Sequence, residues 1–123
     1  MDAIANTGPE FSAASELSEA LDKLWERFLP EIRNRVAALE AAAAACAGQS
    51  LTAAQHREAH AAAHKLAGTL GTFGLAQGSD LALELENLYA LDKAPDAAQG
   101  EQLAALAQEL RLMIESRKRT PEG

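Results

Sequence analysis

The sequence predicts an all-α protein, and amino-acid usage is the first reason. Of its 123 residues, 29 are Ala and 18 are Leu, whereas Val, Ile and Thr together supply only nine. Ala and Leu are good helix formers, and the β-branched and aromatic residues that favour strands are scarce. Apolar residues recur every three or four positions, and the segments between these stripes are short. Together these observations predict an antiparallel, up-down four-helix bundle.

The first helix is predicted from a long apolar stripe that ends near Cys46. Residues 1–14 show no periodicity, so we expect them to form a flexible N-terminal lead-in. Pro30 lies inside the stripe and cannot donate a hydrogen bond to the carbonyl of Glu26, so we expect a kink or a break near residues 27–30. The stripe consists of Leu17, Leu21, Leu24, Phe28, Ile32, Val36, Leu39 and Ala43.

Three further helices follow, each bounded by turn or capping residues. The second begins after the N-cap candidate Thr52 and ends near Phe73, with Gly74 as the stop signal. The third is expected over residues 76–91 and the fourth over 97–117. The bundle then covers residues 15–118, and residues 119–123 form a C-terminal tail. The predicted core contains Leu21, Leu24, Phe28, Leu39, Leu66, Leu70, Phe73, Leu81, Leu85, Leu88, Leu103, Leu106 and Leu110.

Charge and composition exclude several classes of function. The net charge is −7, and no basic block interrupts the periodic region, which argues against a nucleic-acid partner. No apolar run approaches the roughly 20 residues of a membrane span. The N-terminal residues do not have the pattern of a signal peptide. Cys46 is the only cysteine, which suggests a reducing compartment, and we therefore expect a cytoplasmic protein with a small buried thiol.

The second helix carries the most informative residues. Projected at about 100° per residue, His64 points roughly 150° away from the apolar face of this helix and is expected to be exposed. Gly68 and Gly71 follow one and two turns later, and Ala61 and Ala67 flank the histidine. Glycine costs a helix interior about 1 kcal/mol relative to alanine, so two glycines suggest a backbone that must be approached closely. The spacing predicts an exposed imidazole in a patch of minimal side chains.

This segment resembles the signature of histidine-containing phosphotransfer (HPt) domains. It reads AHKLAGTLGTFG over residues 63–74, with an apolar residue two positions after His64, glycine four positions after it, and glycine again at positions 71 and 74. The leucine-patterned helix that follows and the Leu24–Pro30 segment upstream also fit the family. The resemblance covers roughly residues 15–115.

The resemblance implies a phosphorelay intermediate in two-component signalling. His64 would accept a phosphoryl group from a kinase or from an aspartate of a receiver domain and pass it to a receiver aspartate. The partners would be response-regulator receiver domains or a hybrid histidine kinase, and the domain would be a monomer. It would need no ATP site or cofactor of its own, because the receiver would bring Mg²⁺.

The family's frequent lysine three positions after the histidine is replaced here by Ala67. Lys65 is the nearest cation in the sequence, and it projects about 100° from His64. The surface that supports the phosphoryl group or docks the partner is therefore expected to comprise Lys65, Ala67, Gly68, Gly71, His60 and Ala61.

Two other classes of function remain open from the residues alone. His56, His60 and His64 recur every four positions and form a candidate helical metal site, although they drift by roughly 80° about the helix across the two turns. The other alternative is a helical docking or scaffold domain without phosphotransfer.

Overall fold

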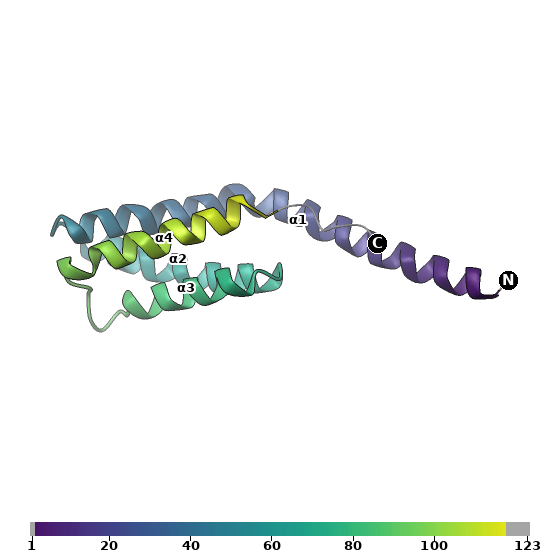
Figure 1. The fold of residues 1–123 in the computed structure, drawn as a ribbon. Coiled ribbons are helices and arrows are strands. Elements are labelled where there is room, and N and C mark those ends of the chain that lie inside the picture. The colour runs from purple at the N-terminus through teal and green to yellow at the C-terminus, as the bar shows by residue number, and fades with distance from the viewer. Residues whose placement is uncertain (1, 118–123) are drawn as a thin grey trace. The chain divides into compact units, whose positions relative to one another are not determined.

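The computed structural model describes residues 2–117 and confirms the predicted all-α fold (Figure 1). Within this range no residue belongs to a strand. The elements are α1 (Asp2–Ala47), α2 (Ala53–Thr72), α3 (Ala76–Leu88), the short 3₁₀ helix η1 (Ala97–Gln99) and α4 (Gly100–Glu115). The predicted boundaries of the last three helices are correct to within a few residues, except that α4 begins after η1 rather than at residue 97.

The described residues divide into two units, residues 2–30 and residues 31–117. In the first unit the helix begins at Asp2, which differs from the lead-in expected over residues 1–14. Pro9 removes only one backbone hydrogen bond from this segment. The alanines among residues 2–14 favour continuation of the helix. The tail expected at residues 119–123 lies outside the described residues.

α1 is continuous through Pro30, so the alternative of a break into two helices near residues 27–30 is wrong. The buried face of the helix before Pro30 also differs from the prediction. Leu24 and Phe28 are 41% and 40% exposed, whereas Trp25 is only 5% exposed. Steps of 3.6 residues back from Ile32 fall between positions 24 and 25, so periodicity alone allowed either choice. The larger Trp25 side chain is the one that is buried.

The second unit, residues 31–117, is the bundle that positions the site. In Figure 1 the end of α1 and helices α2, α3 and α4 run alternately in opposite directions. Its core is made mainly of leucine and alanine. The largest side chains that are almost completely buried are Tyr89, Ile32, Leu39, Leu66, Leu70, Leu85, Leu103, Leu110 and Val36. The other predicted core residues are partly exposed: Leu21 in the first unit, and Phe73, Leu81, Leu88 and Leu106 in the second.

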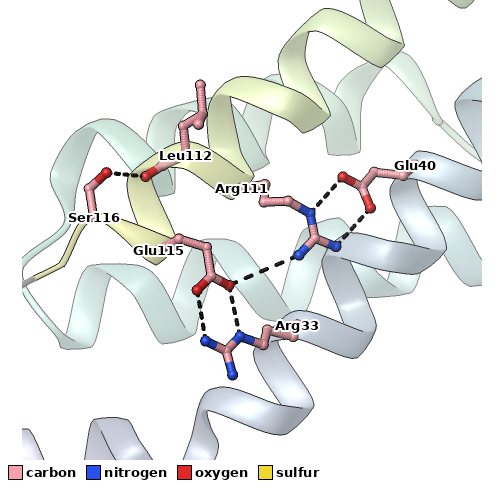
Figure 2. Close-up of polar contacts among 6 residues, drawn as sticks. All are labelled: Arg33, Glu40, Arg111, Leu112, Glu115 and Ser116. Carbon is pink, nitrogen blue, oxygen red and sulfur yellow. Dashed lines mark hydrogen bonds and ion pairs between the residues drawn. The ribbon is translucent and has the colours of Figure 1, made fainter.

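A chain of ion pairs joins the second half of α1 to α4 (Figure 2). Arg33 donates two hydrogen bonds of 2.7 Å to the carboxylate of Glu115, and Arg111 donates two of 2.7 Å to Glu40. Arg111 also lies 4.0 Å from Glu115, which links the two pairs. These bonds from the guanidinium groups lower the pKa values of both carboxyl groups below their ordinary range.

Tight contacts also fix the ends of the helices. Cys46 is buried, as predicted, and its thiol donates to the carbonyl of Asp96 at 3.1 Å. At the start of α4 the backbone of Gly100 approaches Ala47 so closely that an added Cβ would lie 2.6 Å from the Cβ of Ala47. The end of α1 therefore packs directly against the beginning of α4.

Candidate functional site

Helix α2 is the element that positions the candidate site, and both of its ends are well defined. Thr52 and Gln55 form a reciprocal capping box at the N-terminus, which confirms Thr52 as the predicted N-cap. At the C-terminus Gly74 has a φ of +78°, and the amide of Leu75 donates to the carbonyl of Leu70 at 2.9 Å. This arrangement is a Schellman motif, which favours glycine at the left-handed position.

His64 lies on the exposed side of α2. The buried residues of the helix are Ala59, Ala62, Ala63, Leu66, Ala67 and Leu70. In contrast, the His64 side chain is 71% exposed. The core side chains fix the rotation of α2 about its axis, so the imidazole is held toward solvent on a rigid element.

A carboxylate from α3 contacts the ring of His64. The Nδ1 atom of His64 lies 2.9 Å from Oε2 of Glu86, whose own side chain is only 20% exposed. An ionised carboxylate can only accept a hydrogen bond, so Nδ1 must carry the proton. In the neutral ring Nε2 then holds the lone pair. The contact selects the tautomer in which Nε2, on the opposite edge of the ring, is the nucleophilic nitrogen.

His60 approaches the same carboxylate oxygen from one turn earlier in α2. Its Nε2 atom lies 3.8 Å from Oε2 of Glu86, and its side chain is 27% exposed. This distance is too long for a hydrogen bond but is within the range of an ion pair. Glu86 therefore faces two imidazoles, of which only His64 bonds to it directly.

His56 has a different environment from the other two histidines. Its Nε2 atom lies 2.9 Å from the carbonyl oxygen of Tyr89 and 3.0 Å from that of Ala90. Because both partners are acceptors, Nε2 carries the proton and ties the first turns of α2 to the end of α3. The ring is half-buried. His56 thus has a structural role that its place in the sequence did not reveal.

The two glycines after His64 have unequal surroundings. A Cβ added at Gly68 would meet nothing within 4 Å, so packing of the described residues does not require glycine there. A Cβ at Gly71 would lie 3.6 Å from Oγ of Ser79 on α3, which is an ordinary contact. Ser79 in turn donates a hydrogen bond of 2.8 Å to the carbonyl of Ala67. Gly71 therefore lies beside the contact between α2 and α3, and only Gly68 faces open space.

The other residues expected on the docking surface lie in two different places. Ala67 is only 8% exposed and belongs to the core, so it does not offer a partner the accessible surface that the sequence predicted. Ala61 and Lys65 are exposed and line a shallow groove on the side of α2 that faces α1, together with Arg35 and Glu58. Lys65 therefore lies away from the edge of α2 that Glu86 occupies.

Glu86 is the residue that the sequence analysis missed. It is 22 positions from His64, and its pattern in the sequence is that of an ordinary polar residue on an amphipathic helix. The antiparallel packing of α2 and α3 brings the two side chains together. No local spacing could have indicated the contact, because it depends on the relative register of two helices.

Neither a metal site nor a membrane-spanning helix is found in the part of the chain that the structure describes. Among residues 2–117, no group of three or more His, Cys, Asp or Glu side chains is arranged to hold a metal ion. In the same range, no helix combines the length and apolar character that crossing a bilayer demands.

Comparison with known proteins identifies the family. The family model described as Hpt domain matches residues 23–119, which is most of the chain. The chain therefore belongs to the Hpt domain family, whose members are phosphotransfer modules of two-component phosphorelays and interact with receiver domains and kinases. No curated protein and no solved structure matches the chain.

Proposed function

We propose that His64 accepts a phosphoryl group from a kinase or a receiver-domain aspartate and passes it to a receiver-domain aspartate. The observation that carries the proposal is the contact between Nδ1 of His64 and the carboxylate of Glu86 at 2.9 Å. It is a hydrogen-bond arrangement that orients the imidazole for nucleophilic attack, and it occurs on a ring that is 71% exposed. Neither His56 nor His60 combines such a bond with comparable exposure.

The transfer step requires little covalent chemistry from this chain. The Nε2 lone pair attacks the phosphorus of an aspartyl phosphate in line, an N–P bond forms, and the P–O bond to the aspartyl carboxylate breaks. The leaving carboxylate keeps the bonding electron pair, and no proton has to move. The positive charge that develops on the imidazole is then shared with Glu86 through Nδ1–H. The reverse step returns the phosphoryl group to a receiver aspartate by the same geometry.

The surface beside His64 is suited to the approach of a partner. In-line attack requires the phosphorus of the partner's aspartyl phosphate to come within bonding distance of Nε2, which brings the backbone around that aspartate close to α2. Gly68 is one turn after His64, and the space above its Cα is open. We infer that this open space accommodates the partner's active-site loops. The exposed groove that contains Ala61 and Lys65 is the adjoining part of the same proposed docking face.

Replacement of the acceptor tests the proposal. Incubation with a panel of phosphorylated receiver domains should label the wild-type protein and leave His64→Gln unlabelled. The label should be lost in acid and survive base, as expected for a phosphoramidate. Because His64 is exposed and contributes little to packing, the melting temperature of the variant should be nearly unchanged.

Two matched variants on the same helix complete the test. His56→Gln and His60→Gln should both remain competent to accept the phosphoryl group, because neither ring is the proposed nucleophile. Labelling of His64→Gln at the wild-type level would refute the assignment. Absence of labelling in the wild-type protein by every receiver and kinase would favour a docking domain without phosphotransfer.

A further inference from the structure

The carboxylate of Glu86 has a second neighbour that the proposed transfer step does not use. Oε2 of Glu86 accepts from Nδ1 of His64 at 2.9 Å and lies 3.8 Å from Nε2 of His60. His60 and His64 are one turn apart on α2, so their rings are on the same face of the helix. Both rings therefore approach one carboxylate oxygen that belongs to another helix.

The two rings differ in exposure. The side chain of His64 is 71% exposed and that of His60 is 27% exposed. A hydrogen bond from a largely exposed ring competes with water, and the glutamate side chain has several rotamers into which it can turn. One such bond is a weak restraint on the position of Glu86. A second imidazole that is less exposed and lies 3.8 Å from the same oxygen would attract it electrostatically and restrict these rotamers further.

We propose that His60 is a positioning residue that holds the carboxylate of Glu86 beside Nδ1 of His64. Its Nε2–H attracts Oε2 and keeps it on the side of α3 that faces α2. His60 thereby favours the His64 tautomer in which Nε2 carries the lone pair, without touching the phosphoryl group or the partner. The inference rests on the proposed function of His64, which it deepens.

The consequence of losing His60 should be partial rather than complete. Without it, Glu86 turns away for a larger fraction of the time, and His64 then populates the tautomer whose Nε2 is protonated. That tautomer cannot attack phosphorus through Nε2. A partly exposed electrostatic contact contributes little free energy to the position of Glu86. The rate of phosphoryl acceptance should therefore fall only about two- to fivefold.

Two substitutions at position 60 separate the proposed role from simple packing. His60→Leu keeps a side chain of similar bulk but has no donor, whereas His60→Gln has an amide that can donate to Glu86. The fraction of His64 in the Nδ1–H tautomer is measured from the ¹⁵N shifts of its ring, and the rate is measured with a phosphorylated receiver domain. His60→Leu should lower both quantities, and His60→Gln should restore most of each. Helicity by circular dichroism checks that both variants fold.

His56→Gln is the matched control on the same helix. Its ring bonds to the carbonyls of Tyr89 and Ala90 and not to Glu86, so this variant should leave the His64 tautomer unchanged. In a Glu86→Gln background, His60→Leu should have no further effect, because the group that His60 positions has lost its charge.

The outcomes distinguish this inference from the proposed function. If His60→Leu changes neither the tautomer nor the rate, or if its effect persists in the Glu86→Gln background, the positioning role is wrong while His64 remains the acceptor. If His64→Gln still accepts the phosphoryl group, the proposed function itself fails. The tautomer measurement does not depend on any transfer assay.

Discussion

Substitution of Gly68 separates the stability of the bundle from its proposed docking function. Gly68 lies in the interior of α2 and is exposed, and an added Cβ would meet nothing within 4 Å. Gly68→Gln should therefore fold without strain. Glutamine is a better helix former than glycine, so the free energy of unfolding should rise by about 0.5–1 kcal/mol. For a domain of this size that corresponds to an increase in melting temperature of roughly 2–5 °C.

Phosphotransfer should change in the opposite direction. The glutamine side chain would occupy the open space one turn from His64, where the partner's loops are proposed to approach. A loss of about 1.4 kcal/mol at this interface corresponds to a tenfold weaker complex. The assay measures the initial rate of labelling over a range of phosphorylated receiver concentrations. The concentration that gives half the maximal rate should rise about tenfold, in proportion to the weaker complex.

Two control variants make the comparison specific. Gly68→Ala gains helix propensity but adds only one methyl group, so it should be stabilised with a smaller effect on transfer. Ala105→Gln places the same side chain on an exposed position of α4 and should leave transfer unchanged. If Gly68→Gln is stabilised as expected and still transfers at the wild-type rate at every receiver concentration, the open space beside His64 has no role in docking.

Three further predictions concern stability. Gly100→Ala should lower the free energy of unfolding in urea by about 1–3 kcal/mol, because its Cβ would collide with Ala47; unchanged stability would contradict the observed packing. Thr52→Ala should cost about 1 kcal/mol in the same assay through loss of the capping box, and no loss would mean that the cap is not formed. The pKa of Glu40 is lowered mainly by its hydrogen bonds from Arg111, so the stability from this pair is present at neutral pH and is lost as the pH falls through that lowered pKa. The pair is partly exposed and should contribute at most about 1 kcal/mol to the free energy of unfolding. When urea unfolding is compared at pH 7 and pH 3, Glu40→Gln should therefore lose less stability on acidification than the wild-type protein.

Local patterns in the sequence were sufficient to predict the elements of the fold. The ends of α2 were predicted correctly from the apolar spacing, the N-cap Thr52 and the stop signal Gly74. Capping and left-handed termination depend on residues within one turn, so they can be recognised in the sequence. The projection of His64 away from the apolar face also follows from spacing within a single helix. Its exposure was therefore predictable without any knowledge of the other helices.

The same reasoning was insufficient where two positions fitted the period equally well. The spacing of the apolar stripe in α1 allows either Leu24 or Trp25 at the buried position, and in the structure Trp25 is the buried residue. The start of α1 at Asp2 was missed for a related reason, because residues 2–14 lack the apolar periodicity from which a helix is recognised. A helix can form without that periodicity, since it requires only backbone hydrogen bonds.

What the sequence determined by itself was the helical class, the caps of α2 and the exposed position of His64, since each depends on neighbours within one helix. Tertiary structure decided the chemistry around that histidine. It brings Glu86 to Nδ1 of His64, and it places His60 beside the same carboxylate. It also buries Ala67 in the core. These outcomes depend on the register and rotation of α2 against the rest of the bundle, which are set by the packing of the whole core and not by any local spacing.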